Sequence, residues 1–325
     1  MAALWIVLGS VDVGSSLELV SHANPLPLVG VLGVLTTQIL LRAFRWPLLL
    51  PAPRGGGTIS LLRIVPVLLV GYLGNAVLPL RLGEPIRAFL VARRENVDAA
   101  EAFGSVVLER VIDTGTLAID AFIAAIAVGA QEWIVRATGL AAVAGAAAIV
   151  ALVTIGLSPF VRLLDRFAVR LPGATRTEPL RVRLADFARG VDRPSRSRVI
   201  VVAVVVSLAC WMFDAVTFTL VAFSVGVSLN PMAALLIAAV TVLGTALPSA
   251  PGYVGTFELA AAGTAVTLGV AAAPALAIAM LAHVLMVLPV AVGGAISLVA
   301  MDVKLGRLAD DVSGPGSLAL PVVTE

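Results

Sequence analysis

Ten ionisable side chains lie within strongly apolar stretches of this 325-residue chain. Placing one such group in hydrocarbon costs roughly 2.5–3.5 kcal/mol on insertion scales. We therefore expect these side chains to face protein or water, in an ion-pair network or along a polar path. They are Arg81, Glu84, Arg87, Glu109, Arg110, Asp113, Asp120, Asp214, Glu258 and His283.

One group of these residues recurs at the helical period. At about 100° per residue, a single helix face carries Glu109, Asp113, Thr116 and Asp120. Arg110 lies three positions before Asp113, a spacing that favours an ion pair on a helix. Two interpretations stay open. The stripe is either a buried ion-pair network that joins helices or the wall of a charged cavity for a polar head group.

Two distant segments, 74–84 and 244–258, share a pattern of small residues, then Leu-Pro, then a glycine-containing break, then Glu. Proline ends a helix because it lacks a donor and clashes with the preceding turn. Glycine permits the tight turn that follows. The predicted breaks are Pro79 and Gly83 in the first segment and Pro248, Pro251, Gly252 and Gly255 in the second. Duplicated broken helices are typical of transporter substrate sites.

The side chains at these breaks suit anion binding. Arg81 and Arg87 could hold phosphate oxygens, because a guanidinium offers a planar fork of donors. Glu84 precedes a proline, so it could cap the next helix, hold Arg81 or take part in proton coupling. Glu258 stands in the corresponding place of the second segment. His283, which aligns with Arg110, is either a proton relay or a hydrogen-bonded packing residue.

The composition indicates an all-α, polytopic membrane protein. The chain is 60% hydrophobic and its mean hydropathy is +1.05. Long apolar stretches lie at about 27–50, 59–78, 99–128, 134–157, 197–225, 232–247, 256–268 and 274–298. One cysteine permits no internal disulfide, and two histidines argue against a structural zinc site. The apolar start, residues 1–20, is either a poor first helix or follows a true start further upstream.

Arginine distribution predicts the topology. Residues 42–63 hold four Arg and no acid, and residues 162–198 hold ten Arg, so both regions are expected in the cytoplasm. Both arginine-rich regions can lie in the cytoplasm only if the segments near 59–94 and 232–268 are re-entrant hairpins that enter from opposite faces. About six spanning helices then remain, with a cytoplasmic C-terminus in the inner membrane.

The two hairpins divide the chain into similar blocks. The order helix, hairpin, helix occurs twice, in residues 27–128 and, with opposite orientation, in residues 199–301. This predicts an inverted repeat within one membrane domain spanning 1–325. Residues 158–198 between the blocks have amphipathic spacing. They form either two helices on an anionic leaflet or a solvated basic loop. A short polar tail, 302–325, follows.

Three motifs in this order resemble the transmembrane region family of lysylphosphatidylglycerol synthases, also called flippase-like proteins. The first runs from Gly74-Asn75 through Leu78-Pro79, Arg81 and Gly83-Glu84 to Arg87; the others are Glu109-Arg110-x-x-Asp113 and Leu247-Pro248-x-x-Pro251-Gly252-x-x-Gly255-x-x-Glu258. The resemblance implies a protein that moves a lipid or lipid-linked head group. It does not imply synthase activity, which belongs to a separate cytosolic domain. The chain departs from the pattern at His283 and Tyr253.

These observations predict a lipid transporter that is not an enzyme. We expect its partner to be a membrane lipid with an anionic head group, and we expect no cofactor, metal or nucleic acid. The predicted substrate-binding residues are Asn75, Arg81, Glu84, Arg87, Glu109, Arg110, Asp113, Glu258 and His283. Two alternatives remain. One is a secondary transporter of a small anion, and the other is a non-catalytic membrane subunit for a lipid-modifying or glycosyl-transferring enzyme.

Overall fold

The computed structural model describes residues 13–78, 81–168, 178–195, 198–245 and 250–303, and all regular secondary structure in these residues is helical. The elements are α2 (Val13–Ser21), α3 (Pro25–Leu49), α4 (Leu61–Val77), α5 (Gly83–Glu95), α6 (Ala99–Ala127), α7 (Glu132–Thr154), α8 (Ser158–Ala168), α9 (Glu178–Ser195), α10 (Arg198–Ser224), α11 (Pro231–Thr245), the 3₁₀ turn η3 (Pro251–Tyr253), α12 (Thr256–Thr267) and α13 (Ala272–Ala300). The predicted all-α class is confirmed.

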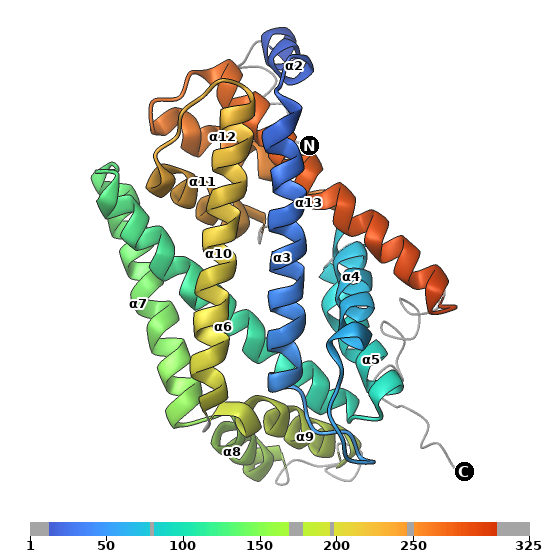
Figure 1. Ribbon diagram of the computed structural model, residues 1–325. Helices are drawn as coiled ribbons and strands as arrows, with labels where there is room; N and C mark the ends of the chain where they lie inside the picture. The colour runs from blue at the N-terminus through green and yellow to red at the C-terminus, as the bar shows by residue number, and fades with distance from the viewer. Residues whose placement is uncertain (1–12, 79–80, 169–177, 196–197, 246–249, 304–325) are drawn as a thin grey trace.

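Four helices, α3, α7, α10 and α13, are long and apolar enough to cross a membrane. Helix α6 is as long as α13, with 29 residues, but it carries the predicted stripe of charged side chains in its middle. The chain is therefore a multi-pass helical membrane protein. Helices α3 and α10 lie side by side through the middle of the molecule (Figure 1).

Local sequence determines where several helices begin and end. Helix α3 begins after Asn24, whose Oδ1 accepts a hydrogen bond from the Leu26 amide at 3.0 Å. Helix α6 begins after Asp98, which accepts from the amides of Ala100 and Glu101. Helix α5 ends at Asn96, whose positive φ of 50° suits a left-handed C-cap. The last two caps position α5 and α6, which carry Glu84, Arg87, Glu109, Arg110 and Asp113.

Two pairs of short helices pack together, α4 with α5 and α11 with α12; we call them the first and second helix pair. Glycines permit the close approach in the first pair. A Cβ atom at Gly83 would lie 1.8 Å from the Gly71 carbonyl oxygen, and one at Gly74 would lie 2.8 Å from the Gly83 Cα. Helix α4 also contacts η3, so the turns of the two pairs lie near each other. The predicted breaks at Pro79 and Pro248 lie outside the described residues.

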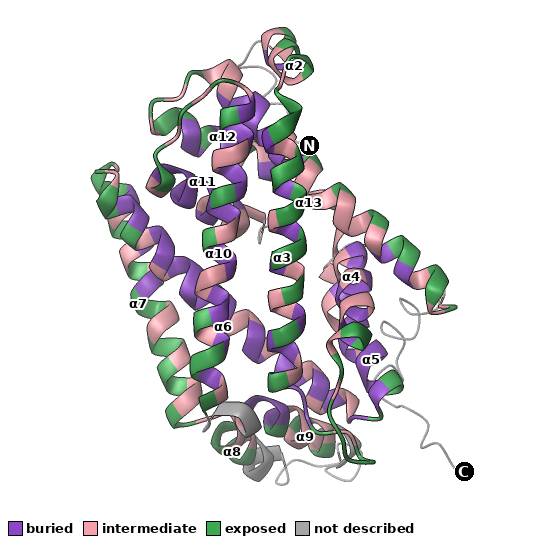
Figure 2. Ribbon diagram, in the orientation of Figure 1, coloured by how far each residue is buried: buried purple, intermediate pink, exposed green. Residues whose placement is uncertain are grey.

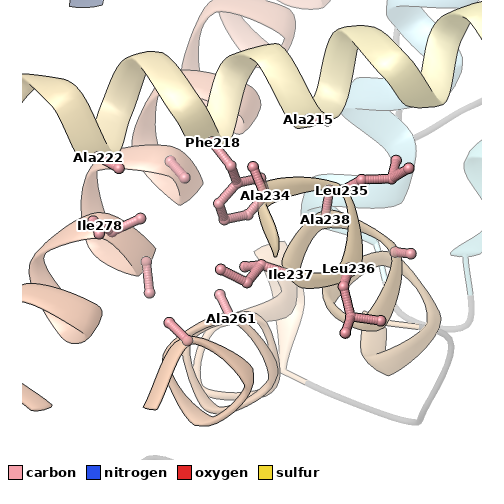
Figure 3. Close-up of a cluster of buried hydrophobic side chains, with 14 of the residues drawn as sticks. Ala215, Phe218, Ala222, Ala234, Leu235, Leu236, Ile237, Ala238, Ala261 and Ile278 are labelled. Atoms are coloured by element: carbon pink, nitrogen blue, oxygen red, sulfur yellow. The ribbon is translucent and has the colours of Figure 1, made fainter. Parts of the chain in front are cut away.

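Buried side chains line the inner faces of the helices, while large apolar side chains cover much of the outer surface (Figure 2). In the largest cluster, Phe218 of α10 packs among Ile237 of α11, Ala261 of α12 and Ile278 of α13 (Figure 3). Alanine is frequent in this cluster, and small side chains let helices approach closely in lipid. The exposed Leu, Ile and Val side chains fit a hydrocarbon environment.

Helices α8 and α9 lie together at one end of the molecule (Figure 1). Helix α9 packs on α6 with direct backbone contact, since a Cβ at Gly190 would lie 2.1 Å from the Glu101 carbonyl oxygen. A Cβ at Gly104 would in turn lie 2.3 Å from the Phe187 carbonyl oxygen. Arg189 adds an ion pair with Glu101 at 3.2 Å. Part of the basic segment is thus fixed to the helix bundle.

Candidate functional site

A cavity of about 250 Å³ lies between the two helix pairs and the middle of α3, α6, α10 and α13; we call it the central cavity. Its lining combines charged and polar side chains, which we call the polar wall, with apolar and aromatic ones, which we call the apolar wall. Its lining residues are Leu35, Gln38, Ile39, Arg42, Tyr72, Asn75, Ala76, Arg81, Glu84, Arg110, Trp211, Asp214, Val242, Thr245, Tyr253, Phe257, Met286, Val287 and Val290. Residues from both halves of the chain therefore share one chamber.

A continuous set of ion pairs includes part of the polar wall and extends behind it; we call it the charge network. It comprises Arg42, Arg45, Glu84, Arg87, Glu109, Arg110 and Asp113. Its centre is Arg45, which is fully buried and donates to Glu109 at 2.7 Å and to Asp113 and Ser207. Four arginines against three carboxylates leave one positive charge when all are ionised.

Arg87 connects the first helix pair to α6. Its guanidinium lies 2.7 Å from Glu84 and 3.0 Å from Glu109, and it stacks 4.9 Å from the Trp46 ring centre. Because Arg87 is only 1% exposed, it has little room for a ligand. Its geometry supports the ion-pair interpretation of this part of the network.

Arg110 is the most accessible member of the charge network, with a side chain 33% exposed on the cavity wall. It lies 3.1 Å from Glu109, 3.4 Å from Asp113 and 3.6 Å from Glu84. These carboxylates hold the guanidinium in place while leaving one side toward the cavity. Arg110 therefore has a fixed orientation and can be reached by a ligand in the cavity.

Arg81 reaches across to the second helix pair. Its Nη2 donates to the carbonyl oxygen of Thr245, at the end of α11, at 2.5 Å. Its guanidinium also lies 5.6 Å from the Tyr253 ring centre. Among the described residues no carboxylate forms an ion pair with Arg81. The turn of the first pair is thus tied to the second pair by a cation that also lines the cavity.

Three buried polar atoms of cavity-lining residues make no hydrogen bond in the described structure: Arg110 Nε and two neutral atoms, the Tyr72 hydroxyl and the Asn75 Oδ1. The amide nitrogen of Asn75 does contact Glu84, at 3.3 Å. Buried polar atoms are normally satisfied by protein, water or ligand. The two neutral atoms therefore add hydrogen-bonding capacity beside the cationic wall.

The second pair has its own acid–base contact, outside the cavity lining. The Nδ1 atom of His283 lies 2.5 Å from Glu258 Oε1, and its Nε2 lies 2.6 Å from the Gly252 carbonyl oxygen. Glu258 also accepts from the Gly255 amide at 2.7 Å. Gly252 and Gly255 have φ of 70° and 89°, which suits residues without a Cβ.

A known protein family matches the part of the chain that holds both helix pairs and the cavity. Residues 1–294 match the lysylphosphatidylglycerol synthase TM region. The chain belongs to this family. The match includes both helix pairs, the charge network and His283, so the family resemblance inferred from the three motifs is confirmed.

One curated relative of this chain is the glycosyltransferase AglD of Haloferax volcanii. The two are 28% identical over 267 residues, which cover 73% of this chain and 43% of AglD. The chain therefore spans less than half the length of that relative. No solved structure matches the chain.

The predicted site residues lie in two separate groups in the structure. The structure brings together Asn75, Arg81, Glu84, Arg87, Glu109, Arg110 and Asp113, at the cavity or directly behind it. Glu258 and His283 instead contact each other beside the second turn. Asp120 is buried without an ion pair in the described residues, although it shares a helix face with Asp113.

Sequence reasoning missed several residues on α3 and α10. Arg42 and Arg45 were assigned to a cytoplasmic arginine cluster, which is wrong for these two, because both lie within α3 and contact Asp113. Only Arg54 and Arg63 of that cluster are largely exposed. The spacing of Gln38, Arg42 and Arg45 could have revealed a polar stripe at helical period.

Asp214 and Trp211 of α10 also line the cavity. Asp214 accepts a hydrogen bond from Gln38 Nε2 at 2.9 Å, and Arg42 lies 5.2 Å from the Trp211 ring centre. In the part of the chain that the structure describes, no group of three metal-ligating side chains gathers.

Proposed function

We propose that this protein binds an anionic lipid head group in the central cavity and moves it across the cytoplasmic membrane. The observation that carries this proposal is the cationic wall formed by Arg42, Arg81 and Arg110, reached from both halves of the chain. Guanidinium groups suit phosphate oxygens because they donate in a planar fork. The excess positive charge of the network favours an anion at this wall.

The proposed roles differ between buried and exposed arginines. Arg110 and Arg81 would contact the head group, since both line the cavity. Arg45 would hold the carboxylates that orient Arg110, because it is buried behind the wall. The apolar wall of Trp211, Phe257 and Met286 would meet the glycerol or prenyl portion of the lipid. The hydrocarbon chains would stay in the bilayer.

Helix lengths support re-entrant hairpins. With 17 and 15 residues, α4 and α11 span about 25 and 23 Å, less than the roughly 30 Å of hydrocarbon. In each pair the chain reverses direction near the cavity, and the second helix packs against the first. We propose that the two pairs enter from opposite faces, with α3, α6, α7, α10 and α13 among the spanning helices, and with the C-terminus in the cytoplasm.

Two pairs of contacts support the proposed inverted repeat. Glu84 lies in the first turn of α5 and approaches Arg110 on the next long helix. Glu258 lies in the first turn of α12 and contacts His283 on the next long helix. Equivalent positions in opposed repeats suit alternating access around a central site.

Reconstitution into proteoliposomes tests the function. The Arg81→Ala and Arg110→Ala variants should each slow head-group translocation roughly tenfold or more, the loss expected for one charge-assisted contact. Arg136→Ala is a matched control, because that arginine is 73% exposed on α7 and contacts Glu132 only. Wild-type translocation and lipid binding in both cavity variants would overturn the site assignment.

The similarity to AglD favours one other function. We propose as the second candidate a non-catalytic membrane subunit that serves a glycosyl-transferring enzyme, with α9 as the contact. Val182→Asp and Leu184→Asp change exposed apolar side chains of α9 without touching the cavity. Loss of glycosyl transfer with intact head-group binding would favour this function. Unchanged transfer in both variants would exclude it.

Two further outcomes distinguish the remaining alternatives. Competition by inorganic phosphate against lipid binding would indicate a transporter of small anions. We propose that the chain alone is not an enzyme, so a purified sample should leave the head group chemically unchanged.

A further inference from the structure

His283 is held between two oxygen atoms that both need a proton. The Gly252 carbonyl oxygen only accepts hydrogen bonds, so the Nε2 atom at 2.6 Å must carry a hydrogen. The Nδ1 atom at 2.5 Å faces the carboxyl of Glu258. One proton must lie between them, on the imidazole or on the carboxyl, for this contact to be attractive. Without that proton, a nitrogen lone pair would face a carboxylate oxygen.

The same ring joins three structural elements. His283 belongs to α13, Glu258 lies in the first turn of α12, and Gly252 is the middle residue of η3. The ring also stacks on Phe257, with 4.4 Å between ring centres. The hydrogen bond from His283 Nε2 to the Gly252 carbonyl oxygen ties this turn to α13.

Movement of this turn would reach the central cavity directly. Tyr253 follows Gly252 and lines the cavity, and Phe257 lines it beneath the histidine ring. Arg81 lies over the Tyr253 ring and is bonded to Thr245. Release of η3 from His283 would therefore shift one wall of the cavity and the contact between the two helix pairs.

Other titratable groups stand apart from this contact. The elements packed against α12 and α13 present Arg42, Tyr72, Arg81, Asp214 and Tyr253 toward the same region, where all five line the cavity. Within the described residues, none of these makes an ion pair or hydrogen bond with His283 or Glu258. The pair therefore binds its proton without another charged partner in contact.

We propose that Glu258 and His283 form a proton-binding site that latches the turn Pro251–Tyr253 to α13 and releases the turn when the proton leaves. This goes beyond head-group binding and assigns a proton as the second ligand of the protein. Proton loss leaves the neutral imidazole with one hydrogen for two acceptors. A nitrogen lone pair then faces either the Glu258 carboxylate or the Gly252 carbonyl oxygen, and this repulsion loosens the contact of α13 with α12 and the turn.

Spin-label distance measurements on the full chain in lipid nanodiscs test the latch. Labels at Val254→Cys and Leu288→Cys, both exposed positions, report the separation of the turn from α13 in a Cys210→Ala background. We expect one short distance at pH 5 and a second, longer population that grows toward pH 9. An identical distance distribution at both pH values would overturn the proposal.

The Glu258→Gln variant is the matched control. A neutral amide donates to Nδ1 and still accepts from the Gly255 amide, so the latch should stay closed at every pH. His283→Phe lacks both contacts and should show the longer distance already at pH 5. A pH response of Glu258→Gln equal to that of the unsubstituted chain would refute the site. These measurements need no transported lipid, so they are independent of the proposed function.

Discussion

Arg87 and Glu109 form a fully enclosed ion pair, with 3.0 Å between Nη1 and Oε2 and only 1% of either side chain exposed. The pair joins α5 of the first helix pair to the long helix α6. Burying two charges is costly, and the cost is recovered only while both partners remain. The pair thus fixes the position of the first helix pair relative to the cavity wall.

Glu109→Ala should destabilise the fold by about 3–5 kcal/mol, because Arg87 and Arg45 would each lose a buried carboxylate. Thermal unfolding in detergent, followed by intrinsic fluorescence, measures the loss. The double variant Arg87→Met/Glu109→Leu should recover part of it, because no unpaired charge remains between the two helices. An unfolding midpoint of Glu109→Ala equal to that of the exposed Arg136→Ala control would contradict this prediction.

Arg45→Lys should not preserve the charge network. The guanidinium of Arg45 contacts Glu109, Asp113 and Ser207 together, whereas an ammonium is a compact point charge. We expect a lower unfolding temperature and roughly tenfold weaker lipid binding, because Asp113 would orient Arg110 less well. Arg54→Lys, on an exposed loop, is the control and should change neither quantity. Full binding by Arg45→Lys would show that the guanidinium geometry is unimportant.

Gly83→Ala should force α4 and α5 apart, because the new Cβ would lie 1.8 Å from the Gly71 carbonyl oxygen. Backbone contacts cannot relax as flexible side chains do, so we expect a stability loss of at least about 1–3 kcal/mol. Gly263→Ala is the contrasting variant, since a Cβ there meets nothing within 4 Å in the interior of α12. It should be neutral or stabilise the protein by about 0.5–1 kcal/mol. Equal unfolding temperatures for the two variants would refute the steric argument.

Arg42→Gln should weaken the binding of a phosphorylated lipid more than Arg63→Gln does. Arg42 lines the cavity, where it lies 3.7 Å from Asp113 and over the Trp211 ring, whereas Arg63 is exposed and pairs with Glu95. Native mass spectrometry of the protein with added lipid provides the comparison. We expect roughly a tenfold loss for Arg42→Gln, the value of one charge-assisted hydrogen bond. Similar binding by both variants would remove Arg42 from the site.

The part of the site that lies on one helix could be predicted from sequence. Helical period placed Glu109 and Asp113 on one face, and both contact the same arginine. Arg110 was also expected to reach Asp113, and it does so at 3.4 Å. These contacts depend only on spacing along α6.

Contacts between distant elements could not be predicted in this way. The bond from Arg81 to Thr245 joins residues 164 positions apart, and it depends on how the two helix pairs pack. Arg45 was misassigned because an arginine count treats every arginine near a helix end as a loop residue. Its burial follows from the matching carboxylates on α6, which lie 64 and 68 positions away.

The backbone contact between Gly104 and Gly190 couples the α8–α9 end of the molecule to its centre. Gly104 lies five residues before Glu109 on the same rigid helix, and α9 touches it without intervening side chains. A displacement of α9 therefore moves α6 as well, because the backbones of the two helices are in direct contact. A partner that binds α9 would therefore act on α6 and, through it, on the cavity that lies among the helices.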